Sequence, residues 1–265
     1  MAHIQVTFMS DALKRTVPLQ VILPVDKLTK EKTKHKPFKT LYLLHGLFGS
    51  SSDWINQTRI KQWAEKYNLA VVMPSGDNSF YIDYDFIPNN EYGRFIGEEL
   101  VEMTRKMFPL SHKREDTFIG GLSMGGFGAL RNGLKYHKTF GSIIALSSAV
   151  HLFEFPGTNL IGEDAVFGDL HQNMKTDKNP RYLIEHFRSK QKPKIYMACG
   201  TEDTLIEANR IYKDLFEKHN FDLTYVEAPG IHDWIFWDKF IYEALQWLPL
   251  DQESEGIHSG HVQED

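Results

Sequence analysis

A serine flanked by glycines is the residue of this chain best suited to act as a nucleophile. Residues 121–125 have the sequence GLSMG, so Ser123 occupies a G-x-S-x-G pattern. This pattern forms a sharp, exposed turn where a strand leads into a helix. An apolar run at residues 117–120 precedes the serine, and a helix-compatible stretch follows it. We therefore expect the Ser123 hydroxyl to stand above a sheet edge, at a helix N-terminus that favours developing negative charge. The alternative is a glycine-rich turn with an incidental serine.

A serine hydroxyl needs a base, and the base needs an acid that orients it. For this strand–turn–helix arrangement the expected order along the chain is serine, acid, histidine. Asp203 follows an apolar run at residues 194–198, and His232 follows another at residues 223–227. All three residues thus come after the carboxyl ends of strands, where they can converge. The sequence predicts Ser123 as nucleophile, His232 as base and Asp203 as orienting acid, with no metal and no cofactor.

Other acids and histidines compete for these roles. Glu202 adjoins Asp203, and adjacent side chains in a turn point in different directions, so we predict that Asp203 alone reaches the histidine. Asp233 is expected to cap the last helix. His137 and His219 end helices and are interpreted as surface or dipole-stabilising residues. The histidines of the 151–192 segment are interpreted as surface residues, with substrate contact as the alternative.

Acyl transfer also needs backbone donors aimed at the developing oxyanion. One expected donor is the N–H of Met124, directly after the nucleophile. The second is expected in the loop after the third strand, where Gly46 allows the Leu47 N–H to turn inward. We interpret the preceding His45 as a residue that packs and forms hydrogen bonds to fix this loop.

The hydrophobic pattern predicts the elements that carry these residues. Several apolar runs are nearly continuous, which is typical of strands covered by helices on both faces. From residue 40 onward strands alternate with helical patterns, so we expect a mostly parallel eight-stranded sheet whose first two strands form an antiparallel pair. The expected strands are 4–9, 17–23, 40–44, 69–73, 117–120, 142–146, 194–198 and 223–227, and the expected helices are 53–67, 91–108, 124–136, 205–219 and 234–247. Residues 151–192 interrupt this alternation, and we expect a small insertion over the active site.

Composition limits the classes of function. The 265 residues are 42% hydrophobic and 25% charged, which is ordinary for a globular protein. The net charge of −5 gives no general attraction to nucleic acid or anionic membranes. We expect a single domain at residues 1–250, a disordered tail at 251–265, and a small-molecule ester as the partner, without nucleic acid or membrane; the oligomeric state is left open. One cysteine and no visible signal peptide or apolar span favour a cytoplasmic location.

Four motifs carry a family resemblance. The segments LYLLHGLFGSSSDW, GGLSMGGFGALR, CGTEDTL and APGIHDW resemble the esterase D-like group of α/β-hydrolases, with bacterial tributyrin esterases most similar and carbohydrate esterase family 1 nearby. The resemblance runs from about residue 4 to residue 248. It implies an α/β-hydrolase fold and a carboxylic ester hydrolase with short acyl preference. It carries over Ser123, Asp203 and His232 as the triad, and Leu47 and Met124 as oxyanion donors.

The same resemblance bears on substrate contacts. Residues 78–81 resemble the family's Asn-Ser-Trp-Tyr loop near the site, with Phe in place of Trp. We therefore expect Asn78, Ser79, Tyr81 and Trp234 to bind substrate. The aromatic loop at residues 80–86 either walls the pocket or packs against the sheet rim. A further hypothesis is that three phenylalanines of the 151–192 segment cap the acyl pocket, namely Phe153, Phe155 and Phe167.

Several functions stay open at this point. S-formylglutathione hydrolases of this group usually have a cysteine just after the HGL-like loop, whereas residues 48–52 are FGSSS. Feruloyl and acetylxylan esterases share the motifs, although many are exported. Acyl transfer to an alcohol would require exclusion of water, for which the sequence gives no sign. A non-catalytic binding protein on this fold would usually have lost a triad member.

Overall fold

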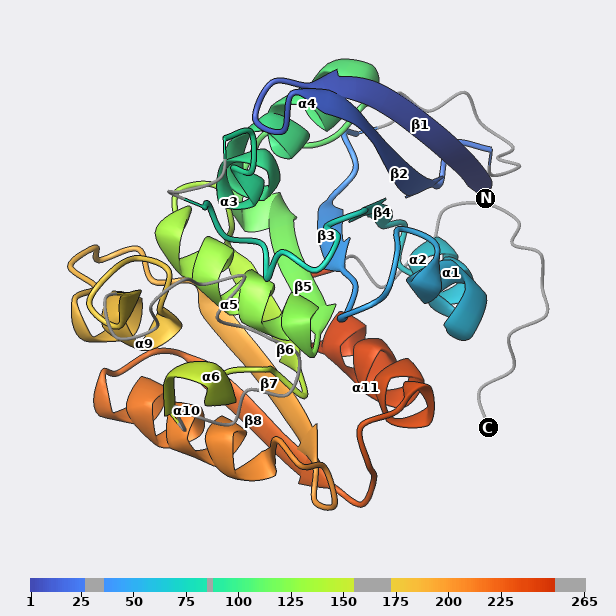
Figure 1. Ribbon diagram of the computed structural model, residues 1–265. Helices are drawn as coiled ribbons and strands as arrows, with labels where there is room; N and C mark the ends of the chain where they lie inside the picture. The colour runs from blue at the N-terminus through green and yellow to red at the C-terminus, as the bar shows by residue number, and fades with distance from the viewer. Residues whose placement is uncertain (27–35, 85–87, 155–172, 251–265) are drawn as a thin grey trace.

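Eight strands form one sheet in the computed structural model, which describes residues 1–26, 36–84, 88–154 and 173–250 (Figure 1). The strand order is β1-β2-β4-β3-β5-β6-β7-β8. The first two strands pair antiparallel with each other, β2 pairs antiparallel with β4, and the remaining neighbours are parallel. The bounds are β1 Ala2–Ser10, β2 Arg15–Leu23, β3 Thr40–Leu44, β4 Ala70–Pro74, β5 Thr117–Leu122, β6 Ser142–Leu146, β7 Lys194–Gly200 and β8 Leu223–Ala228. The predicted mostly parallel eight-stranded sheet is confirmed, as is the leading antiparallel pair.

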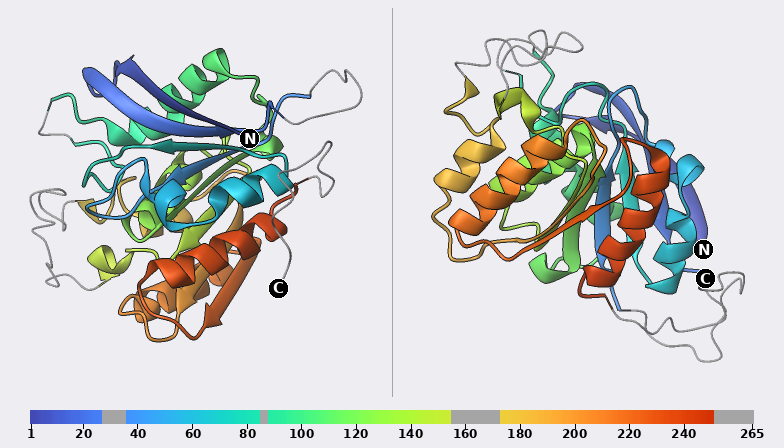
Figure 2. Two further views of the ribbon diagram at one scale, coloured as in Figure 1. Left: turned by 90° about the vertical axis from the view of Figure 1, so that its right-hand side faces the viewer. Right: turned by 90° about the horizontal axis from the view of Figure 1, so that it is seen from below.

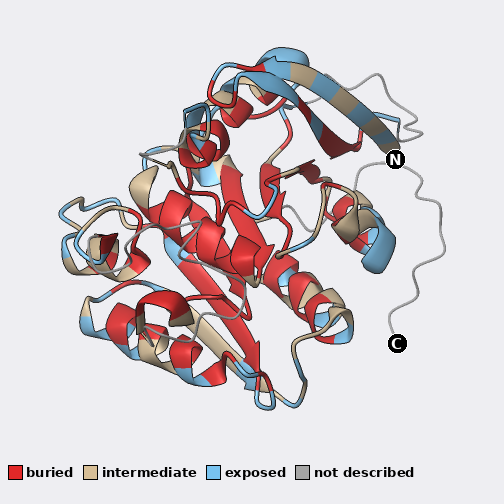
Figure 3. Ribbon diagram, viewed as in Figure 1, coloured by how far each residue is buried: buried red, intermediate tan, exposed pale blue. Residues whose placement is uncertain are grey.

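Helices cover both faces of the sheet (Figures 1 and 2). The buried side chains between helices and sheet form two apolar cores. One face is covered by α1 (Asp53–Gln57), α2 (Ile60–Lys66) and α11 (Trp234–Trp247). The other is covered mainly by α4 (Leu100–Met107), α5 (Met124–Lys135) and α10 (Ile206–Lys218). Strands β3 to β6 are buried along their whole length, whereas β1 alternates between partly buried and exposed residues (Figure 3). The central strands therefore form a rigid platform whose carboxyl ends hold the predicted site residues.

The predicted helix at 53–67 is wrong as a single element, because the structure divides it into α1 and α2. Thr58, between them, has an extended backbone with φ −136° and ψ 169°. Its hydroxyl donates to the Trp54 carbonyl and accepts from the Ile60 N–H at 3.2 Å. A threonine that bonds to neighbouring backbone groups competes with the helix. Here it closes one helix and opens the next.

The predicted helix at 91–108 is continuous but contains a wider turn. It begins as α3 (Tyr92–Arg94), passes through a π-helical turn at Phe95–Glu99 and ends as α4. A short 3₁₀ turn at Arg114–Asp116 leads into β5.

Among the described residues, no helix combines the length and apolar character needed to cross a membrane.

The segment at 151–192 is described only at its two ends. It begins with α6 (His151–Glu154) directly after β6 and resumes at residue 173, before α9 (Pro180–Glu185). The latter helix lies against α5 and α10 (Figure 1). Phe153 of α6 is buried, and its ring stacks on Phe127 of α5 with a centroid separation of 6.2 Å. Phe155 and Phe167, named for the same acyl pocket, lie outside the described residues, as does the predicted tail.

The break at Thr58 generates a stability prediction. Thr58→Ala removes the hydroxyl that serves both helix ends, so we expect the free energy of unfolding to fall by about 1 kcal/mol. For a protein of this size that corresponds to a decrease in Tm of about 2–4 °C. Thr58→Ser is the matched control, because it keeps the hydroxyl and should retain most of the stability. Thermal unfolding followed by circular dichroism measures both; equal losses in the two variants would contradict the capping role.

Candidate active site

The turn that presents Ser123 is strained and closely packed. Ser123 lies between β5 and α5 with φ 52° and ψ −118°, a left-handed backbone conformation that non-glycine residues rarely adopt. A Cβ on Gly121 would lie 2.4 Å from the Gly125 carbonyl oxygen, and one on Gly125 would lie 2.4 Å from the Leu44 carbonyl oxygen. Both glycines of the motif are therefore required by backbone contact, as expected for a strand–turn–helix elbow.

Ser123, His232 and Asp203 form one line of hydrogen bonds. The Nε2 of His232 lies 3.0 Å from Ser123 Oγ, and its Nδ1 lies 2.8 Å from Asp203 Oδ2. Because the carboxylate accepts from Nδ1–H, Nε2 of the neutral ring is left as the acceptor for the serine hydroxyl. Both distances are in the range needed for proton transfer and for orientation of the base. The structure thus brings together the three side chains singled out as a triad.

Asp203 is held as a buried, charged acceptor. Its side chain is fully buried and also accepts from the Leu205 N–H at 2.9 Å. Burial acts to raise the pKa of Asp203, but the hydrogen bond and charge of His232 and the backbone donor outweigh it. The net effect lowers the pKa below its ordinary value, so the carboxylate stays ionised.

Glu202 stabilises a turn and is not part of the hydrogen-bond line. It is exposed, and its Oε2 accepts from the Gly230 N–H at 2.7 Å and from the Thr201 hydroxyl at 2.8 Å. It therefore braces the turn that precedes His232 and does not touch the ring. Asp233 caps α11 through a 3.0 Å bond from the Phe236 N–H, as the sequence predicts.

The loop after β3 lies beside the serine. A Cβ on Gly46 would lie 3.6 Å from Ser123 Cβ, and Leu47 lines the same cavity as Ser123. Met124 is the first residue of α5, where backbone N–H groups have no partner within the helix. The amides of Leu47 and Met124 are thus both candidates for binding the oxyanion that forms when Ser123 attacks a carbonyl group.

His45 orients the peptide that carries the Leu47 N–H. Its buried ring accepts from the Gly76 N–H at Nε2, at 2.9 Å, so Nδ1 carries the proton and donates to the Gly46 carbonyl at 2.6 Å. A peptide unit is planar and trans, so fixing the Gly46 C=O also fixes the opposed Leu47 N–H. Burial lowers the pKa of His45, which keeps the ring neutral. The expected loop-fixing role of His45 is confirmed.

A cavity of about 630 Å³ opens in front of these groups. This volume is ordinary for a small-molecule site. Trp234, expected to bind substrate, lies in its wall, and its ring packs edge-on against Trp54 and Trp237 at 5.5 and 5.1 Å. The lining residues are Gly46, Leu47, Phe48, Gly49, Asp53, Leu122, Ser123, His232, Asp233, Trp234 and Trp237.

Three residues expected to bind substrate, Asn78, Ser79 and Tyr81, are not part of this lining. Ser79 and Tyr81 are buried, and the Tyr81 hydroxyl donates to the His45 carbonyl at 3.0 Å. Asn78 is exposed, but its Oδ1 accepts from the Phe48 N–H at 2.8 Å. For residues 80–82 of the aromatic loop, the structure favours packing over pocket formation, since all three are buried.

Sequence reasoning missed several cavity residues. Trp237 packs perpendicular to the His232 ring at 4.8 Å and donates to Ser147 Oγ at 3.1 Å. Its spacing of three from Trp234 within a helix was a usable signal, because residues three apart share a helix face. Phe48 and Asp53 carried no comparable signal. Within the described ranges, no three His, Cys, Asp or Glu side chains gather as metal ligands would.

Comparisons with known proteins show which family and which solved structures this chain resembles. A model of the Esterase family matches residues 10–248. An acetyl esterase of Caldicellulosiruptor saccharolyticus is 44% identical over 262 residues, which cover 94% of this chain and 98% of the relative. Two solved structures from Staphylococcus aureus cover 93% of this chain and 98% of their own: a fluorophosphonate-binding serine hydrolase F with bound substrate (TM-score 0.84, 33% identity) and an S-formylglutathione hydrolase (TM-score 0.81, 32% identity).

The hydrogen-bond line generates a kinetic prediction. Asp203→Asn keeps the shape of the side chain but presents an amide to His232, which disfavours the productive tautomer, so kcat for p-nitrophenyl acetate should fall by about 10³–10⁴-fold. Glu202→Gln is the matched control one residue away. It keeps a side-chain oxygen for the Gly230 N–H, so kcat should stay within about twofold of the wild type. A large loss in Glu202→Gln with a small one in Asp203→Asn would reverse the assignment.

Proposed function

The chain belongs to the esterase family and has the α/β-hydrolase fold, and from that membership we propose that it hydrolyses short-chain carboxylic esters through an acyl-enzyme on Ser123. The observation that carries the proposal is the hydrogen-bond line from Ser123 through His232 to Asp203, at the wall of a cavity. The enzyme class follows from the family; the roles of individual residues are our assignment.

In the proposed first step the Ser123 oxygen attacks the ester carbonyl while His232 Nε2 takes the hydroxyl proton. The carbonyl oxygen becomes an oxyanion, which the N–H groups of Leu47 and Met124 stabilise. His232, now an imidazolium, is stabilised by the ionised Asp203. It gives its proton to the departing alkoxide, which leaves as an alcohol, and the acyl group remains bound to the Ser123 oxygen.

In the second step water replaces the alcohol. His232 takes a proton from water as it attacks the acyl-serine carbonyl, and the same two amides hold the second oxyanion. Return of the proton to Ser123 releases the carboxylic acid. The lowered pKa of Asp203 keeps its negative charge opposite the imidazolium throughout.

A short acyl group is the preferred substrate feature in this proposal. The supporting finding is the 44% identity with a relative named acetyl esterase over nearly the whole of both chains. We place acetyl and butyryl esters ahead of longer ones.

Thioester hydrolysis of S-formylglutathione is the second candidate, supported by the 32% identical solved structure. The charge of the cavity weighs against it. Among the described lining residues Asp53 and Asp233 are acidic, and none is Lys or Arg. Glutathione carries two carboxylates, which this lining would repel, and like-charge contacts are a common means of rejecting a substrate. We therefore rank neutral esters above this anionic thioester.

A substrate panel tests the proposal. Wild type and Ser123→Ala are compared on p-nitrophenyl acetate, butyrate and octanoate, methyl ferulate, acetylated xylo-oligosaccharide and S-formylglutathione. We expect the wild type to favour acetate and butyrate, and Ser123→Ala to lose about 10⁴-fold or more in kcat. A fluorophosphonate should label one serine of the wild type and none in Ser123→Ala.

Three other results would each change the proposed function or mechanism. Equal activity of Ser123→Ala and wild type would remove Ser123 as the nucleophile. A strong preference for ferulate or acetylated xylan would move the function to carbohydrate deacylation. A preference for S-formylglutathione would show that the acidic lining does not reject anions.

A further inference from the structure

Two amides from distant parts of the chain must point at one oxygen, and buried contacts link them. We propose that Tyr81 is a positioning residue that, together with Asn132, sets the Leu47 amide against the Met124 amide. The inference rests on the proposed esterase function and reassigns Tyr81, which lies outside the cavity lining.

The first contact is between Tyr81 and the loop. The fully buried Tyr81 hydroxyl donates to the His45 carbonyl at 3.0 Å, and its ring lies edge-on to the imidazole of His45 at 5.8 Å. His45 in turn fixes the Gly46–Leu47 peptide plane through its own ring. Tyr81 therefore holds the peptide immediately before the one that carries the proposed donor.

The second contact is between Tyr81 and α5. Asn132, also fully buried, donates through Nδ2 to the Tyr81 carbonyl and to the Gly128 carbonyl, both at 2.9 Å. Its Oδ1 accepts from Arg131 Nη1 at 2.8 Å, so the amide is bonded at both ends. Since α5 begins at Met124, the helix that supplies one proposed amide also anchors the residue that supports the other.

Backbone strain marks the same residue. Phe80 and Tyr81 have φ values of 51° and 58°, two consecutive non-glycine residues in the left-handed region. Such a conformation is strained and persists where surrounding contacts over-determine it, often at functional sites. Two glycines leave room for the ring: a Cβ on Gly76 or Gly128 would lie 2.0 or 2.5 Å from Tyr81.

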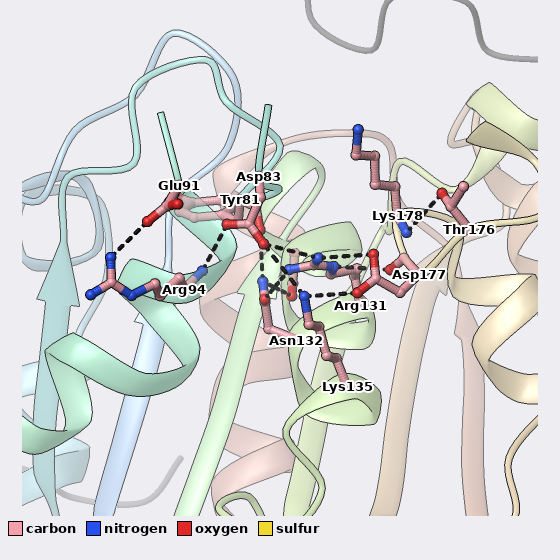
Figure 4. Close-up of polar contacts among 11 residues, drawn as sticks. Tyr81, Asp83, Glu91, Arg94, Arg131, Asn132, Lys135, Thr176, Asp177 and Lys178 are labelled. Atoms are coloured by element: carbon pink, nitrogen blue, oxygen red, sulfur yellow. Dashed lines mark hydrogen bonds and ion pairs between the residues drawn. The ribbon is translucent and has the colours of Figure 1, made fainter. Parts of the chain in front are cut away.

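An ion cluster secures the loop beyond Tyr81 (Figure 4). Asp83 accepts from the Arg94 N–H at 2.9 Å and pairs with the fully buried Arg131 at 3.3 Å and with Lys135 at 3.4 Å. The last two side chains also pair with Asp177, at 3.4 and 2.7 Å. Because Arg131 and Lys135 belong to α5, the loop is tied to that helix on both sides of Ile82.

Tyr81→Phe is the decisive variant, and Tyr42→Phe is its matched control. Tyr42 is equally buried, and its hydroxyl shares one 2.8 Å hydrogen bond with Thr104, away from the site. The measurements are kcat and KM for p-nitrophenyl acetate, the Ki of n-butylboronic acid as a tetrahedral adduct, and Tm. We expect Tyr81→Phe to lower kcat and weaken boronate binding by about 10- to 100-fold, less than outright loss of an oxyanion donor, with KM nearly unchanged. Tyr42→Phe should change Tm alone.

Asn132→Asp provides a second route if Tyr81→Phe fails to fold. It keeps the size of the side chain but replaces the Nδ2 donor to the Tyr81 carbonyl with an oxygen, so kcat and boronate affinity should fall together. The inference is overturned if kcat is unchanged in the variants that fold, or if KM alone rises, which would indicate direct substrate contact. A wild type without esterase activity would instead overturn the proposed function.

Discussion

The close approach of α5 to the ends of β3 and β5 is the constraint on which the rest of the site depends. Gly125 packs with its Cα facing the Leu44 carbonyl, at a separation that leaves no room for a methyl group. That contact forces the chain through a left-handed residue at Ser123 and places the first amides of the helix beside the end of β3. The buried pairing of β3 with β5 over five residues offsets this strain.

Polar groups behind the site follow from the same geometry. Once α5 lies against the end of β3, the loop after β3 has no regular ladder to satisfy its carbonyls, and buried carbonyls need donors. The ring of His45 donates a hydrogen bond to the Gly46 carbonyl, and the hydroxyl of Tyr81 donates one to the His45 carbonyl. Buried polar networks are rigid when fully satisfied, which suits groups that must not move as charge develops.

The order of elements and the three aligned side chains could be predicted from sequence because both follow from topology. Parallel strands bring their carboxyl ends to one edge, so Asp203 and His232 were identifiable from their positions after apolar runs. Competition between a polar side chain and the hydrogen bonds of a helix was less visible in the sequence. Nothing in the periodicity of residues 53–67 shows that Thr58 would break the helix. The role of Tyr81 was also hidden, since a left-handed tyrosine depends on Gly128, 47 residues away, to make room for its ring.

The exposed side chains near the cavity contrast with the buried polar groups that hold the loop after β3. Phe48, which lines the cavity, is 76% exposed, and Ile235, which follows the lining residue Trp234 in the chain, is 82% exposed. Neither side chain belongs to the line from Ser123 to Asp203 or to the hydrogen bonds of the His45 ring. Both side chains are thus separate from the buried groups that hold the two proposed oxyanion donors. The fold therefore fixes the position of the buried donors, whereas the choice of substrate depends on side chains that can vary at the cavity rim.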